Sequence, residues 1–159
     1  MTQDSEIAAD ISARLLPSDD AVELFSPSTT VLQKKINEIP IPVMAYVGDA
    51  VFEVFARLNS LKTSEWKMNT LHRASVRLVK AESQAELLRL LEPHLSEVEK
   101  DIVRRGRNAK SGQVPRSVSA VLYRYSTAFE TLVGYLYLTN RHRRIEELFS
   151  LIGLSDSSA

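Results

Sequence analysis

The sequence contains no cysteine among its 159 residues. This absence excludes disulfide bonds, thiolate nucleophiles and zinc sites built on thiolates, and it is compatible with a reducing compartment. No apolar run approaches the roughly twenty residues that a membrane span requires. The N-terminus also lacks the basic and then apolar pattern of a signal peptide. We therefore expect a soluble, cytoplasmic protein with no membrane partner.

The chain also has no net charge, because 20 basic residues balance 20 acidic ones. The balance is uneven: residues 1–30 contain six acids and one base, which leaves 19 bases against 14 acids in the other 129 residues. The excess is sharpest over residues 100–116, where six bases face a single acid. A cluster of this kind can neutralise several phosphates, so a nucleic acid is a candidate partner.

The helical period dominates the apolar pattern, and no strand or repeat is evident, so the predicted fold class is all-α. A hydrophobic content of 44% in a chain of this length suits one domain with a real core. A Gly, Asn, Ser and Pro-rich stretch, 106–116, is predicted to be a loop. The predicted helices cover about 43–58, 64–91 with a break, 96–105, 118–138 and 142–151.

Two acids interrupt apolar helical runs that are far apart in the sequence. Asp49 lies within the run 43–55, and Glu130 lies within the run 128–138. A buried carboxylate costs several kcal/mol, to order of magnitude, unless a cation or strong donors compensate it. Glycine or alanine beside each acid permits close contact between helices. Two such acids predict a shared metal ion, and oxygen ligands with an incomplete protein shell favour Mg²⁺.

Each acid also has a structural interpretation. Asp49 alone is equally consistent with a buried acid that a tyrosine or an arginine such as Arg124 satisfies. Glu130 alone is consistent with a solvated flank or an interhelical salt bridge. A di-iron carboxylate site is set aside, because no histidine has a glutamate three residues before it.

Two other basic stretches are weighed and left outside the site. A stripe of bases at helical spacing, Arg73, Arg77 and Lys80, is typical of a solvated helix face. The run 141–144 stands at a predicted helix start, where positive charge opposes the helix dipole. That cost hints at contact with an anionic partner, although solvation could offset it.

The motifs together resemble Mini-ribonuclease III. They are the Gly-Asp-Ala sequence at 48–50, the helix with Glu130 and Gly134, and the Arg-Arg-Gly-Arg-Asn-Ala-Lys sequence at 104–110. That family has the ribonuclease III catalytic domain without a separate double-stranded RNA-binding domain. The resemblance implies a ribonuclease III-like catalytic domain over 37–152, after an acidic N-terminal extension, 1–36, that is partly helical or loose, and before a flexible tail, 153–159.

The resemblance also implies a homodimeric, Mg²⁺-dependent endoribonuclease that cuts double-stranded RNA and leaves 5′-phosphate and 3′-hydroxyl ends. Asp49 and Glu130 match the family's catalytic and metal-binding acids. Full-length ribonuclease III enzymes have two further acids, whose places are taken here by Ala45 and Thr127. The usual substrate of the family is precursor large-subunit ribosomal RNA.

The basic loop is assigned to RNA binding in place of the missing domain, because double-stranded RNA is recognised through its shape and phosphates. A non-catalytic RNA-binding or ribosome-associated relative would keep this loop without needing both acids. A purely structural helical module would tolerate Asp49→Asn. No unpaired apolar stripe identifies a dimer interface in the sequence. The predicted RNA contacts are Arg104, Arg105, Arg107, Asn108, Lys110 and Arg116.

Overall fold

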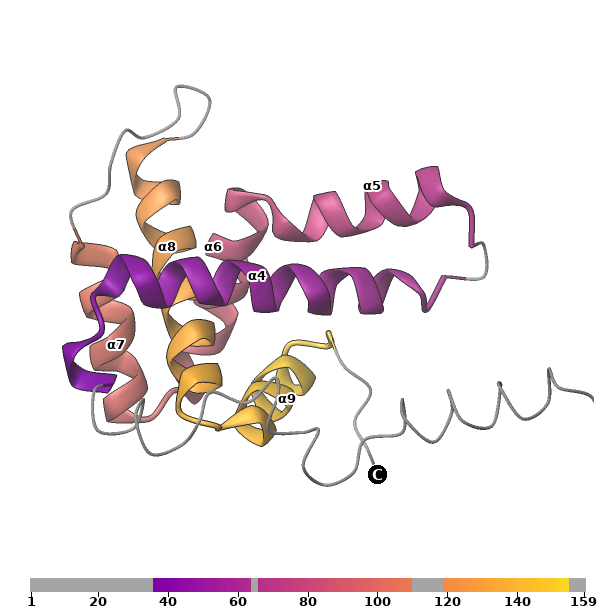
Figure 1. Cartoon of the computed structure of the whole chain (residues 1–159). Helices are drawn as coiled ribbons and strands as arrows, with labels where there is room; N and C mark the ends of the chain where they lie inside the picture. The colour runs from indigo at the N-terminus through magenta and orange to yellow at the C-terminus, as the bar shows by residue number, and fades with distance from the viewer. Residues whose placement is uncertain (1–35, 64–65, 110–118, 155–159) are drawn as a thin grey trace, which may run out of the picture.

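The computed structural model describes residues 36–63, 66–109 and 119–154, which form helices and, within these ranges, no β-strand (Figure 1). The predicted all-α class is therefore confirmed. Nearly all of the acidic extension and the end of the tail lie outside the described residues. The helices are α4 (Ile41–Ser60), α5 (Met68–Val79), α6 (Ala81–Leu91), α7 (Glu97–Asn108), α8 (Ala120–Leu138) and α9 (His142–Leu151), with 3₁₀ turns at Ile36–Glu38 and Glu92–His94.

The helix boundaries follow local chemistry. Pro42 lies in the first turn of α4, where a missing N–H leaves no hydrogen bond unmade. Ser96 caps α7 in a capping box, since its hydroxyl accepts from the Glu99 amide while the Glu99 carboxylate accepts from the Ser96 amide. Ser119 caps α8 through the Leu122 amide. The predicted break in the second helix falls at Lys80, whose extended backbone separates α5 from α6.

Helix α8 is the centre of the bundle and packs against α4, α6 and α7 (Figure 1). Its Phe129 is fully buried and meets Phe52 of α4 edge to face, with ring centroids 4.7 Å apart. Phe149 of α9 joins the same cluster, at 5.8 Å from Phe52. Each such buried side chain stabilises the fold by about 1.5–3 kcal/mol. The aromatic cluster therefore fixes α4, α8 and α9 together.

The predicted loop at 106–116 begins too early, because α7 continues through Asn108. Gly106 is not a turn residue here. A Cβ atom at this position would lie 2.8 Å from the Thr131 hydroxyl oxygen and 2.9 Å from the Ala128 Cα. The glycine thus allows α7 to pack tightly on α8, and local composition could not distinguish that use from a turn. Residues 110–118 lie outside the described part.

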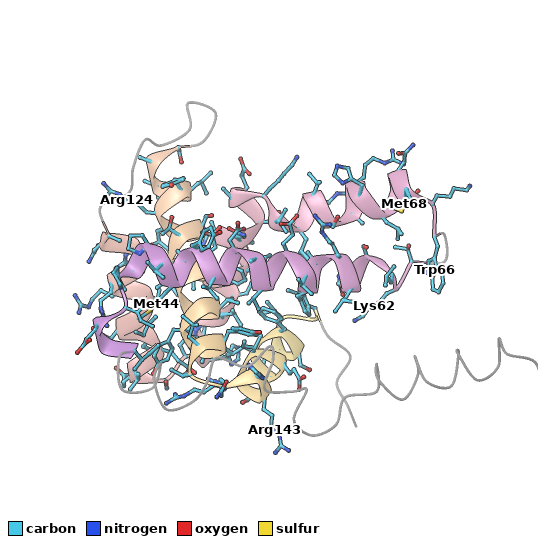
Figure 2. The ribbon with its side chains drawn as sticks, viewed as in Figure 1. Met44, Lys62, Trp66, Met68, Arg124 and Arg143 are labelled. Atoms are coloured by element: carbon cyan, nitrogen blue, oxygen red, sulfur yellow. The ribbon has the colours of Figure 1, made fainter. Side chains whose placement is uncertain are left out.

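Helices α4 and α5 run side by side and extend beyond the rest of the bundle (Figure 1). Trp66 and Met68 lie at the far end of this pair, with about three quarters of each side chain exposed (Figure 2). One face of α4 is apolar and yet open to solvent. This α4 apolar face consists of Val43, Tyr46, Val54 and Leu58, all exposed, and Tyr46 is 79% exposed. No helix of the described ranges is long and apolar enough to cross a membrane.

Candidate active site

The two acids are brought together where α4 crosses α8. The helix backbones touch at this crossing, since a Cβ atom at Gly48 would lie 1.8 Å from the Glu130 carbonyl oxygen. One at Gly134 would lie 1.9 Å from the Met44 carbonyl oxygen. Two glycines, one on each helix, therefore make the contact possible. Asp49 follows the first glycine directly, and Glu130 lies one turn before the second.

The acid pair, Asp49 and Glu130, shares one electrostatic environment. Burial raises the pKa of Glu130 to about 7, and the neighbouring Asp49 carboxylate contributes to that rise. The pKa of Asp49 is also raised, first by partial burial and then by Glu53, one turn further along α4. An effect of the Asp49 carboxylate on Glu130 requires the two residues to be near one another, as the contact between their helices also indicates. The crossing of α4 and α8 thus brings Asp49 and Glu130 to one place, and their sharing of a metal ion stays a prediction.

The degree of burial differs from the expectation. Glu130 is half-buried, but Asp49 is exposed. The run around Asp49 is apolar because one side of α4 packs on α8 and another presents the apolar face to solvent. Asp49 lies at the edge between these two sides. An acid in an apolar run can therefore be open to solvent, which a catalytic ligand requires.

The structural alternatives for the acids find no support. Among the described residues no cation forms an ion pair with Asp49 or Glu130, and Arg124 is exposed without bonding either acid. Glu53 is already paired, since its carboxylate accepts from Arg57 at 2.6 Å. The acid pair thus has uncompensated negative charge.

The donor set fits a divalent ion that keeps several waters. The described residues contain no group of three or more His, Cys, Asp or Glu side chains that could hold a metal. A cation between two neighbouring carboxylates stabilises their ionised forms, and Mg²⁺ often binds through one or two carboxylates, waters and substrate phosphates. A transition-metal site built on histidine is not present in this part of the chain.

A buried glutamine beside Glu130 was not found from the sequence. Gln84 of α6 is 1% exposed, and its Oε1 accepts from the Ser126 hydroxyl at 2.6 Å. Its Nε2 faces the Glu130 carboxyl and lowers that group's pKa, which offsets part of the rise. Even so, Nε2 has no partner at full hydrogen-bond geometry. The sequence signal for Gln84 is a polar residue at helical spacing from Leu87, Leu88 and Leu91, which is weak by itself.

The predicted RNA-binding residues differ in their exposure and in their contacts with the rest of the protein. Arg104 is exposed but bonded to Asp101, and Arg105 is half-buried. Arg107 lies over the Tyr125 ring at 5.6 Å and donates to its hydroxyl at 3.4 Å, so it also links α7 to α8. Asn108 is exposed at the end of α7. Lys110 and Arg116 lie outside the described residues. RNA binding by this set stays a prediction.

A second basic surface lies on α5. Its groove has a volume of about 260 Å³ and is here called the α5 basic groove. Helix α5 contains no acidic residue, and no ion pair to the arginines or the lysine is found in the described ranges. Elsewhere exposed helical bases such as Arg57 and Arg89 pair with an acid one turn away. The lining residues are His72, Arg73, Val76, Arg77 and Lys80.

The basic run 141–144 contacts acidic residues of the protein itself, through Arg144. Arg144 donates to both carboxylate oxygens of Glu99, at 2.9 and 3.0 Å, and bridges to Glu147 at 2.7 Å. Glu99 is only 2% exposed. Arg141 lies over the Tyr135 ring at 5.6 Å. These contacts tie α9 to α7 and account for Arg144 without an external ligand, whereas Arg143 is exposed and points away from the bundle (Figure 2).

Comparison with known proteins gives a consistent result. The family model described as the ribonuclease III domain matches residues 43–141. A Mini-ribonuclease 3 of Thermoanaerobacter sp. (strain X514) is 41% identical over 128 residues, which cover 80% of this chain and 90% of that protein. The Mini-ribonuclease 3 of Symbiobacterium thermophilum is 46% identical over 110 residues, covering 69% and 85%. A crystal structure of a Fusobacterium nucleatum protein aligns with a TM-score of 0.66 and 26% identity, over 74% of this chain and 94% of that one.

Proposed function

Because the chain belongs to the ribonuclease III family, and within it to the Mini-ribonuclease III group, it is an endoribonuclease, and we propose that it cuts double-stranded RNA with a divalent metal ion. The observation that carries the proposal is the acid pair at the crossing of α4 and α8. Burial and the neighbouring Asp49 carboxylate raise the pKa of Glu130, and no cation of the described residues forms an ion pair with either acid. A structural pair of acids would be expected to have such a partner.

Asp49 and Glu130 would hold the metal, which we propose to be Mg²⁺. When bound, the ion supplies Lewis-acid stabilisation of charge on the scissile phosphate and makes a water easier to deprotonate. The contribution of the protein is to hold the two carboxylates in position. Asp49 is exposed and can meet the phosphate backbone, whereas the half-buried Glu130 is set by the helix crossing. Hydrolysis would leave 5′-phosphate and 3′-hydroxyl ends.

RNA binding is assigned to the end of α7 and the segment that follows it. Arg105 and Asn108 project from the last turn of α7, which Gly106 holds against α8. The α5 basic groove is a second candidate contact, because its bases lack acidic partners in the described part of the chain. Phosphates of an A-form helix are the anions that both surfaces would bind. The substrate we propose is precursor large-subunit ribosomal RNA, processed in the cytoplasm.

A homodimer is the proposed active form. The α4 apolar face supports it, since this face presents several large apolar side chains to solvent at helical spacing. A groove of about 290 Å³ adjoins it, lined in part by Leu61, Met68 and Leu71. Asp49 lies at the edge of the same face, so a second copy bound there would place the two sites close to the interface.

The test is cleavage of a perfectly paired RNA by the wild type and Asp49→Asn, with Mg²⁺ and with a chelator. We expect cleavage by the wild type with Mg²⁺ alone, and a loss of at least about 1,000-fold in the variant, because an amide oxygen is a poor substitute for a charged ligand. Persistent cleavage in the chelator or the variant would refute the assigned mechanism. RNA binding without any cleavage would favour the alternative, a non-catalytic RNA-binding or ribosome-associated protein.

A further inference from the structure

Gln84 is a buried polar residue that the acid pair alone does not explain. Its side chain is 1% exposed, and it lies on α6, which packs on α8 but supplies neither acid. An amide with an unmade hydrogen bond in such a position costs on the order of 1–3 kcal/mol. A buried polar group with this cost calls for a physical reason at its location.

The orientation of the Gln84 amide is fixed by one contact. Its Oε1 accepts the Ser126 hydroxyl proton at 2.6 Å, so Nε2 is the atom left for other partners. Ser126 is also buried, at 7% exposed, and it lies about one helical turn before Glu130 on α8. Residues four apart on a helix lie on the same side, so the amide reaches the surface that carries Glu130.

The N–H donors of this amide are available to Glu130, which lies four residues after Ser126 on α8. Nε2 is a buried donor with no hydrogen-bond partner among the described residues, and the amide that carries it is bonded to Ser126, a neighbour of Glu130 on the same side of α8. A carboxylate has about four lone-pair sites, and a metal ion uses one or two of them. One N–H donor on the opposite side would leave the remaining sites facing the ion.

We propose that Gln84 is a positioning residue: the Ser126 hydroxyl orients its amide, and the amide holds the Glu130 carboxylate in the orientation that binds the divalent ion. This inference rests on the proposed function and assigns a role within the same site. Outer hydrogen-bond partners of ligating groups commonly change metal affinity or activity by about 10 to 100-fold when they are removed.

The test measures metal binding without RNA, using Mn²⁺ as the probe and its electron paramagnetic resonance signal as the readout. Gln84→Met keeps a similar length but has no donor. We expect it to weaken Mn²⁺ binding by about 10-fold or more, and to raise the Mg²⁺ concentration for half-maximal cleavage, while the KM for RNA changes by less than about 2-fold. Gln84→Glu should weaken binding, because its carboxylate cannot donate when ionised.

Ser126→Ala has a matched control in Ser75→Ala. Both serines are 7% exposed, but the Ser75 hydroxyl bonds only to backbone carbonyls of its own helix. We expect Ser126→Ala to weaken Mn²⁺ binding by a smaller factor than Gln84→Met, and Ser75→Ala to leave it unchanged. Equal effects of the two serine changes would contradict the proposal, since general destabilisation would then explain both.

Two outcomes separate this inference from the function on which it rests. If the wild type binds Mn²⁺ and Gln84→Met binds it equally well, Gln84 has no positioning role and the proposed function stands. If the wild type binds no Mn²⁺, both fail. Should Gln84→Met not fold, the side-chain amide of Gln84 can be followed by NMR in the wild type. Mg²⁺ should shift that signal, and an unshifted signal would overturn the inference.

Discussion

Gly48 and Glu130 are in backbone contact, although they come from distant parts of the chain. The carbonyl oxygen of Glu130 occupies the place that a Cβ atom of residue 48 would take, at 1.8 Å. This contact determines how near Asp49, the next residue, comes to the Glu130 side chain. Packing and chemistry are therefore coupled at one point of the fold.

Gly48→Ala is expected to destabilise the protein by about 3 kcal/mol or more, because α4 and α8 must separate at their crossing. The sign is informative, since alanine in place of glycine inside a helix is otherwise stabilising by about 1 kcal/mol. Urea denaturation followed by circular dichroism measures the change. We also expect a loss of cleavage at temperatures where the variant is still folded.

Gly153→Ala is the control. No atom lies within 4 Å of the position that its Cβ would take, and its backbone has a φ of 72°. The cost there should be about 1–2 kcal/mol of backbone strain, with cleavage unchanged. A Gly48→Ala protein as stable as the wild type would show that the crossing is looser than described.

The stability of the metal-free protein should fall as the pH rises from about 4.5 to 7. The folded protein holds a proton on Glu130 up to a pKa of about 7, whereas the unfolded chain loses it near 4.5. Over that interval the folded state binds more protons, so a higher pH favours unfolding, by on the order of 2 kcal/mol in total. Thermal unfolding in a chelator across this pH range measures the effect.

Glu130→Gln should remove most of that pH dependence, because an amide does not titrate. Asp49→Asn should remove part of it, since Asp49 contributes to the raised pKa of Glu130. Mg²⁺ should restore the stability of the wild type at pH 7 and above and have little effect on either variant. A wild-type melting temperature that rises from pH 4.5 to 7 would contradict this account.

The α4 apolar face should be the dimer interface. Val54→Asp combined with Leu58→Asp is expected to give a folded monomer with greatly reduced cleavage, because a charge in the centre of an apolar interface is left unpaired. Sedimentation at several protein concentrations measures the change. Val98→Asp on α7 is the matched control, since Val98 is 55% exposed and Val54 is 60% exposed. A wild type that sediments as a monomer at micromolar concentration would refute the interface.

The α5 basic groove should contribute to RNA affinity. The triple change Arg73→Ala, Arg77→Ala and Lys80→Ala is expected to weaken double-stranded RNA binding and to lower the slope of log K against log salt by about 2–3, near one for each lost phosphate contact. Binding of a catalytically inactive protein at several salt concentrations measures this.

A second triple variant is the control for charge alone. It replaces Arg57, Arg89 and Lys100 with alanine, and all three are exposed bases that pair with acids one turn away. Its salt slope should stay close to that of the wild type. Equal losses in the two triple variants would mean that overall charge, not the groove, determines RNA binding.

The sequence was sufficient to predict the helical class and the position of most helices. The three- and four-residue spacing of apolar residues in 118–138 matches α8, and Ser96 and Glu99 carry the chemistry of a cap. The two acids could also be found, because an acid inside an apolar run is costly and rare. These features are local, so they can be read along the chain.

Other features depend on packing and could not be predicted. The end of α7 was placed too early because Gly106 serves a helix contact instead of a turn. The exposure of Asp49 and the α4 apolar face depend on which side of α4 meets α8. The role inferred for Gln84 depends on Ser126 and Glu130, which lie on another helix. Such relationships join residues that the sequence separates.

The buried pair of Glu99 and Arg144 has a further consequence for handling the protein. Burial alone would raise the pKa of Glu99, but hydrogen bonds from Arg144 and Ser96 outweigh it and lower the pKa. The stability from this carboxylate is present above its unfolded pKa and is lost on acidification through the folded one. Glu130 acts in the opposite sense toward neutral pH. A chelated sample should therefore keep best in a mildly acidic buffer, some distance below the pH at which a metal-loaded enzyme would work.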